Sequence, residues 1–167
     1  PEQTDWHRIA AIYDALAQVT PSPVVELNRA VAVGMAFGPA AGLEIIDSLR
    51  DDKSLRNYQW LPSVRGDLLA KLGRHAEAEV LFRKVLDIKE RTMTAGAPGI
   101  AVTLHGLAGV LRDQGRHAEA EPYYVRALEI RRRAHGPDDL SVADTRRDYA
   151  AMLRASGRMA EANAMEP

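Results

Sequence analysis

The five histidines are the residues of this 167-residue chain best suited to acid–base or metal chemistry. None of them stands in an HExxH motif, and the chain has no GxSxG, GxGxxG or GxxxxGK[ST] motif. The absence of cysteine excludes thiolate nucleophiles, disulfides and thiolate zinc sites. His75 and His117 both stand two residues after a glycine, at equivalent positions that favour packing. We therefore predict no catalytic, metal or cofactor site, and a protein that is not an enzyme.

The charged residues are balanced overall but clustered locally. The 22 lysines and arginines face 23 aspartates and glutamates, and the formal net charge is -1. This balance gives no general attraction to nucleic acid or to an anionic membrane. Arginines nevertheless gather at 131–133 and at Arg146, Arg147, Arg154 and Arg158. We interpret these clusters as a solvated face, with a bound acidic peptide as the alternative.

A seven-residue string recurs along the chain and reveals its organisation. GRHAEAE occupies 73–79 and 115–121, and GRMAEAN follows at 157–163, so that the glycines are 42 residues apart. Apolar residues with a helical period precede each glycine, as at Leu104 and Leu107, and resume after it. Each repeat is therefore predicted to contain two antiparallel helices joined at a glycine with left-handed backbone angles.

The helical pattern extends over the whole chain, and no segment alternates as a strand would. Small residues recur at 42-residue intervals where two helices must meet closely, as at Ala78, Ala120 and Ala162. We predict an all-α protein without strands, a single right-handed solenoid of antiparallel helix pairs over residues 1–167. The nine predicted helices span 5–19, 23–36, 39–50, 57–72, 75–92, 98–114, 117–135, 140–156 and 159–165.

Small, glycine and aromatic residues at these fixed offsets resemble the tetratricopeptide repeat (TPR). The 42-residue period, together with the string ALEIRRRAHGPDDLSVADT at 127–145, is similar to the repeats of kinesin light chains and their bacterial relatives. This resemblance covers residues 74–167. In the unit that begins near Ala101, the matching residues are Leu104, Leu107, Ala108, Leu111, Gly115, Ala120, Tyr124 and Ala127.

The first part of the chain, residues 1–73, is similar to a more particular group. The strings TDWHRIAAIYDAL (4–16), TPSPVVELNRAVAV (20–33) and GPAAGLEIIDSL (38–49) resemble the TPR-like C-terminal extension of extracytoplasmic-function RNA polymerase sigma factors. The two resemblances meet near the string at 73–79. This change of type favours a bacterial chimera, natural or engineered.

The TPR resemblance implies a groove, lined by the first helix of each pair, in which a partner peptide lies. Kinesin-light-chain repeats usually carry asparagines there in a string such as LNNLA. Here the corresponding strings are LHGLA (104–108) and RRDYA (146–150), so the second half departs from that groove chemistry. The candidate groove residues are Asn28, Ser63, Asp67, His105, Arg112, Arg147 and Arg154.

The last predicted helix is short, and this affects the C-terminal end of the solenoid. We expect it to leave a ridge of Tyr149, Met152 and Leu153 poorly covered. An exposed apolar ridge marks a contact surface, and we predict self-association as a homodimer through this end. The alternative is local exposure without any partner.

These patterns together predict a non-enzymatic scaffold for a protein or peptide partner, with no cofactor and no direct nucleic-acid contact. The front half implies a regulatory segment of a sigma factor. The alternative is a chimeric repeat protein with a structural or self-assembly role and no specific ligand. No apolar run reaches the about 18 residues of a membrane span, and we expect a cytoplasmic protein.

Overall fold

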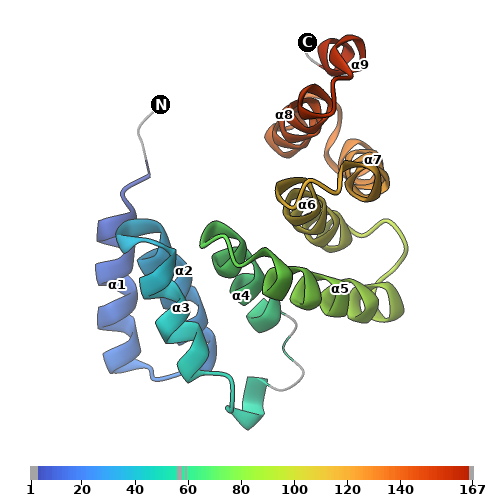
Figure 1. Cartoon of the computed structure of the whole chain (residues 1–167). Helices are drawn as coiled ribbons and strands as arrows, with labels where there is room; N and C mark the ends of the chain where they lie inside the picture. The colour runs from blue at the N-terminus through green and yellow to red at the C-terminus, as the bar shows by residue number, and fades with distance from the viewer. Residues whose placement is uncertain (1–3, 56–57, 59, 166–167) are drawn as a thin grey trace. The chain divides into compact units, whose positions relative to one another are not determined.

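The computed structural model is built from α-helices joined by short connections (Figure 1). It describes residues 4–55, 58 and 60–165, and within these residues it contains helices and no strand. The predicted all-α class is therefore confirmed. The helices are α1 (Trp6–Val19), α2 (Pro23–Phe37), α3 (Pro39–Ser48), a short 3-10 helix η1 (Lys53–Leu55), α4 (Trp60–Lys71), α5 (His75–Thr92), α6 (Pro98–Asp113), α7 (His117–His135), α8 (Leu140–Ala155) and α9 (Met159–Ala164).

The chain divides into two compact units, Pro1–Leu81 and Phe82–Pro167, and the division falls inside α5. In the first unit α1 packs on α2, α2 packs on α3 and α4, and α3 packs on α4. In the second unit α6 packs on α7, α7 on α8 and α8 on α9, and α6 also contacts α8. Each unit therefore buries its apolar residues between consecutive helices. A single right-handed solenoid through both units stays a prediction.

The turn between the two helices of each repeat depends on glycine, as predicted. Gly73, Gly115 and Gly157 have φ angles of 74°, 75° and 79°, which disfavour any residue with a Cβ atom. In each turn the amide after the glycine donates to a carbonyl oxygen five residues earlier, at 2.9 Å. This closing bond satisfies a carbonyl group that the helix end would otherwise leave unpaired.

Side chains before the helices set their starting points. Ser22 Oγ accepts a hydrogen bond from the Val24 amide at 3.3 Å, with Pro23 as the first residue of α2. Asp139 Oδ1 caps α8 in the same way. At α1, Asp5 stands directly before the helix, and its side chain accepts a hydrogen bond from the Arg8 amide at 3.0 Å.

Small residues lie at the predicted close contacts between helices. Ala78, Ala108, Ala120, Ala150 and Ala162 are each 0% exposed. Their lack of bulk lets neighbouring helix axes approach, because any larger side chain at these positions would push the axes apart.

One glycine also makes room for a ring. A Cβ atom placed on Gly106 would lie 2.8 Å from Cζ of Phe82, whose side chain is buried. One repeat later the ring position is Tyr124, which is 0% exposed. Glycine on α6 therefore accommodates the large ring that α5 directs toward it.

A buried cation near the end of α5 binds the start of α6. Lys89 is 0% exposed, and its Nζ donates to the Gly99 carbonyl oxygen and to Thr103 Oγ1, both at 2.9 Å. Burial lowers the pKa of Lys89 below its ordinary value. The lysine therefore connects the second helix of one repeat to the first helix of the next.

The same contact recurs 42 residues later at the start of α8. Arg131 Nη1 donates to the Ser141 carbonyl oxygen at 2.7 Å and to Thr145 Oγ1. Burial lowers the pKa of Arg131, while Asp144, Asp139 and Asp148 oppose this effect. Arg131 is thus a half-buried structural residue, unlike its exposed neighbours Arg132 and Arg133.

Two glycine substitutions should have opposite effects on stability. Gly115→Ala should lower the free energy of unfolding by about 1 kcal/mol, because φ is 75° there. Gly109→Ala should raise it by about 0.5–1 kcal/mol. Gly109 is inside α6, and an added Cβ would only meet the Tyr124 hydroxyl at 3.8 Å. Urea unfolding of both variants measures the difference, and a Gly115→Ala protein as stable as the wild type would contradict the turn assignment.

Candidate protein-interaction face

The first helices of two consecutive repeats, α6 and α8, contact each other and share a polar surface. We call this surface the α6/α8 face and define it by His105, Arg112, Arg147 and Asp148. Lys89 and Arg131 fix the first turns of the two helices, and the face lies one to three turns further along each of them. The whole face belongs to the second compact unit.

Asp148 is the centre of the α6/α8 face. Its Oδ2 lies 3.2 Å from Nε2 of His105, which donates a hydrogen bond across from α6. The guanidinium groups of Arg112 and Arg147 approach its Oδ1 at 3.9 and 3.7 Å. One half-buried carboxylate therefore gathers three basic side chains from two repeats.

This arrangement keeps Asp148 ionised. The hydrogen bond from His105 lowers the pKa of the Asp148 carboxyl group below its usual range. Partial burial opposes this effect, but the positive charges of Arg112 and Arg147 add to it.

Two stacked tyrosine rings, which we call the aromatic floor, pack beneath His105. The Tyr124 ring meets the His105 ring edge to face, with centroids 5.9 Å apart, and stacks on Tyr149 at 5.6 Å. Burial raises the pKa of Tyr124 to about 12, so its hydroxyl stays neutral at physiological pH. The floor is therefore rigid and uncharged, and it limits the orientations that His105 can adopt.

The outer part of the face is accessible to a partner. The Arg147 side chain is 71% exposed, while those of His105, Arg112 and Asp148 are between 24 and 29% exposed. Guanidinium groups held in place bind carboxylates through charge-assisted hydrogen bonds. Among the described residues no group of three or more metal-ligating side chains occurs. Arg112 and Arg147 also pair with Asp113 at 2.8 Å and with Asp144 at 3.0 Å, so three carboxylates surround the basic groups of the face.

The structure brings together three of the predicted groove residues, His105, Arg112 and Arg147. Arg154, further along α8, is half-buried and interacts with other residues. Sequence reasoning missed Asp148, the residue that organises the others. A signal existed, because Asp148 occupies one of the asparagine positions of the LNNLA pattern in the string RRDYA.

The other predicted groove residues lie in the first unit and do not form a comparable cluster. Asn28 is exposed on α2, and Ser63 is half-buried on α4. Asp67 is exposed on α4 and pairs with Lys71 at 2.8 Å. Although α2 and α4 pack together, no hydrogen bond or ion pair joins Asn28 to Asp67 within the described part of this unit.

The predicted exposure of the C-terminal ridge is wrong. Tyr149 is 5% exposed, and Met152 and Leu153 are both 0% exposed. The physical reason is that α7 and α9 pack on either side of α8, and even six residues of α9 suffice to cover it. In addition, the Tyr149 hydroxyl donates to Glu121 Oε1 at 2.7 Å. Met152 and Leu153 therefore cannot themselves contact a second copy.

Two family models match the chain, at residues 65–93 and 99–166, and both describe a tetratricopeptide repeat. An uncharacterized protein of Rhizobium meliloti (strain 1021) is 45% identical over 86 residues, which make up 52% of this chain. The chain spans only 20% of the length of that relative. None of the described helices combines the length and apolarity that a membrane span requires.

Solved structures resemble this fold over nearly the whole chain. A Podosopora anserina kinesin light chain with nearly identical TPR-like repeats has a TM-score of 0.74 at 16% identity, covering 96% of this chain and 82% of that one. BtubC (BKLC) from P. vanneervenii has a TM-score of 0.67 at 19% identity, with 98% and 71% covered. MamA AMB-1 has a TM-score of 0.59 at 20% identity, with 96% and 78% covered. At these identities the likeness establishes the fold.

Replacing Asp148 should change how stability depends on pH. Asp148→Asn should lower the free energy of unfolding at pH 7 by about 1 kcal/mol, because the contacts of the ionised carboxylate with His105, Arg112 and Arg147 are lost. The folded-state pKa of Asp148 is lowered, so its contribution is present above the unfolded pKa of about 3.9 and is lost as pH falls through the folded value. Urea unfolding at pH 7, 5 and 3 measures the difference.

The matched control for that experiment is Asp138→Asn, at an exposed loop position. It should leave stability unchanged at all three pH values. If the deficit of the Asp148→Asn protein were as large at pH 3 as at pH 7, the ionic role of Asp148 would be disproved.

Proposed function

Because the chain is a tetratricopeptide-repeat protein, as its sequence indicated, we propose that it is a non-enzymatic scaffold whose α6/α8 face binds an acidic segment of a partner. Tetratricopeptide repeats generally mediate protein–protein interactions, and the fold is generally a non-enzymatic one. A stack of helices offers a broad and rigid surface for this purpose.

The observation that carries the proposal is the cluster around Asp148. Asp148 shares the basic side chains of the face with Asp113, which pairs with Arg112 at 2.8 Å, and with Asp144, which pairs with Arg147 at 3.0 Å. It also orients these side chains before any partner arrives, which reduces the entropy lost on binding. The exposed Arg147 guanidinium then offers donors to a carboxylate of the partner.

The partner is best described by its chemistry. An extended or helical peptide with one or two aspartates or glutamates would match the guanidinium groups of Arg112 and Arg147. Charged and polar contacts of this kind contribute more to specificity and to the association rate than to the affinity. Binding should therefore weaken when the salt concentration rises.

The front half supports a proposal about the biological setting. Its strings at 4–16, 20–33 and 38–49 resemble the extension of extracytoplasmic-function sigma factors. A partner within the bacterial transcription machinery, in the cytoplasm, would agree with this resemblance. The first unit contributes exposed polar residues such as Asn28 and Asp67 to a contact of this kind.

Exchange of one exposed arginine tests the binding face. A random peptide library displayed on phage and selected on the purified chain should yield peptides enriched in aspartate and glutamate. Arg147→Ala should weaken their binding about fivefold, because one charge-assisted hydrogen bond is lost. Isothermal titration calorimetry measures the affinity.

Arg91→Ala is the matched control. Arg91 is 76% exposed and pairs with Asp87 on its own helix, just as Arg147 pairs with Asp144. It lies on α5, away from the α6/α8 face, and its loss should leave binding unchanged. Equal effects of the two substitutions, or selected peptides without acidic residues, would refute the proposal.

A further inference from the structure

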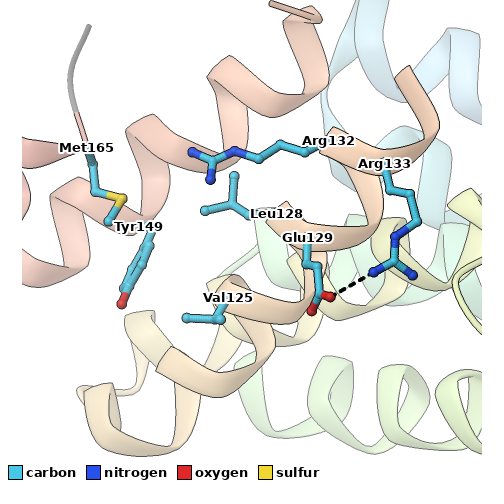
Figure 2. A pocket seen from close by; sticks show the side chains of 7 residues that line it. All are labelled: Val125, Leu128, Glu129, Arg132, Arg133, Tyr149 and Met165. Carbon is cyan, nitrogen blue, oxygen red and sulfur yellow. Dashed lines mark hydrogen bonds and ion pairs between the residues drawn. The ribbon is translucent and has the colours of Figure 1, made fainter. Parts of the chain in front are cut away.

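The hydroxyl group of Tyr124 is a buried hydrogen-bond donor. The side chain is 0% exposed, and its hydroxyl has no hydrogen-bond partner of normal geometry among the described residues. The neighbouring Tyr149 differs, because its hydroxyl donates to Glu121 Oε1 and its side chain lines a hollow beside α7 (Figure 2). Since burial raises the pKa of Tyr124 to about 12, its hydroxyl keeps the proton at physiological pH and can donate it to an acceptor.

The packing of the Tyr124 ring does not require this hydroxyl. One 42-residue period earlier the same position is Phe82, which is also buried. A phenyl ring is therefore enough to fill the space between repeats. A buried donor without an acceptor lowers stability, because it loses its hydrogen bonds to water and gains none in the folded chain. The hydroxyl of Tyr124 thus costs stability without improving the packing.

Gly109 is a second residue at the same place that lowers stability. It lies inside α6, where glycine is less favourable than alanine. Among the described residues, the one atom outside α6 within 4 Å of an added Cβ would be the Tyr124 hydroxyl oxygen, at 3.8 Å. The corresponding residues of the neighbouring repeats are Asp67 and Ala151. Neither the helix nor the repeat therefore requires glycine at this position.

Gly109 and the Tyr124 hydroxyl lie together on the α6/α8 face, and we call them the Gly109 site. Gly109 stands four residues after His105 and three before Arg112, on the same side of α6. It is half-buried, so the site reaches the surface. Because glycine has no side chain, the main chain of a partner can approach α6 closely here, and an oxygen beside Gly109 comes within reach of the hydroxyl.

The charges around the Gly109 site favour an uncharged acceptor. Besides burial, which raises the pKa of Tyr124 most, the charge of Arg112 lowers it and those of Asp148 and Asp113 raise it. Two carboxylates therefore act on the hydroxyl together with one cation, and a third carboxylate would be repelled. A main-chain carbonyl group accepts a hydrogen bond without this repulsion. Such carbonyls are available along an extended segment, whereas those of a helix are mostly bound within it.

We infer that the Tyr124 hydroxyl donates a hydrogen bond to a main-chain carbonyl oxygen of a partner segment that lies extended across Gly109. The inference rests on the proposal that the α6/α8 face binds a partner. It adds the conformation of the bound segment and the residue that recognises its main chain. It also explains why two neighbouring residues both lower stability, since departures from the locally favoured residue are expected where a protein binds.

The test compares binding with stability in the same variants. The probe is the tightest-binding acidic peptide of the phage library. Tyr124→Phe should weaken its binding about fivefold in calorimetry, because one hydrogen bond is lost, and Gly109→Ala should have a similar effect by keeping the main chain away. Both variants should nevertheless unfold at a higher urea concentration than the wild type. A purely structural role would instead reduce binding and stability together.

Tyr123→Phe is the matched control. Tyr123 is the preceding residue of α7, and its hydroxyl accepts a hydrogen bond from Arg83 at 3.2 Å. Its replacement should leave peptide binding unchanged. Thioamide substitutions along the peptide then locate the acceptor, because sulfur accepts hydrogen bonds weakly. At one position the thioamide should weaken binding to the wild type but not to Tyr124→Phe.

The outcomes separate this inference from the proposed function. If Arg147→Ala weakens binding but Tyr124→Phe does not, the inference is wrong and the proposed function stands. A peptide that NMR shows to be helical when bound would have the same meaning. A Tyr124→Phe protein less stable than the wild type would also overturn the inference, since the hydroxyl would then be satisfied in the free protein. If Arg147→Ala binds as tightly as Arg91→Ala, the proposed function fails and the inference fails with it.

Discussion

Two cations, the buried Lys89 near the end of α5 and the half-buried Arg131 near the end of α7, make the contacts on which the second unit of this protein depends. Lys89 and Arg131 each donate to a backbone carbonyl group and to a threonine hydroxyl in the first turns of the following helix. Burying a charge is costly unless it is fully hydrogen-bonded, so these contacts allow few alternative positions of the helices. Together with the small residues at the helix crossings, they fix α6 and α8 relative to α5 and α7.

The α6/α8 face follows from this constraint. His105 and Asp148 come from different repeats and meet only if both helices keep their rotation and height. The charge of Asp148 then holds Arg112 and Arg147 beside it, and the Tyr124 ring packs edge to face against His105. A few residue differences between neighbouring repeats can in this way create a polar site on a surface built from otherwise equivalent helix pairs.

The framework could be predicted from the sequence because it is periodic. Each of its features has a local physical cause that can be recognised from a single residue. This holds for the glycines at 73, 115 and 157, for the alanines at the helix crossings and for the N-caps at Ser22 and Asp139. The nine α-helices within the described residues follow from the same signals. The burial of the ridge of Tyr149, Met152 and Leu153 was not predicted. It depends on how far the short helix α9 extends over α8, and the repeat period does not determine this.

The site was harder to predict than the fold. His105, Arg112 and Arg147 could be placed on a groove from their register, but their convergence on Asp148 depends on side-chain directions across two helices. The role of Arg131 was also missed, since the sequence of an arginine run such as 131–133 does not distinguish a half-buried member from an exposed one. Partner chemistry follows from these contacts and not from the repeat pattern.

The most direct test of this account is an NMR titration of the Asp148 carboxyl carbon in the wild type and in Lys89→Met. The account predicts that Asp148 titrates below its usual range in the wild type, because α6 presents His105 to it. In Lys89→Met, which lacks the contact that holds α6, the pKa of Asp148 should return toward its ordinary value. A wild-type Asp148 with an ordinary pKa, or a variant that keeps the lowered pKa, would contradict the claim that the buried Lys89 positions the site.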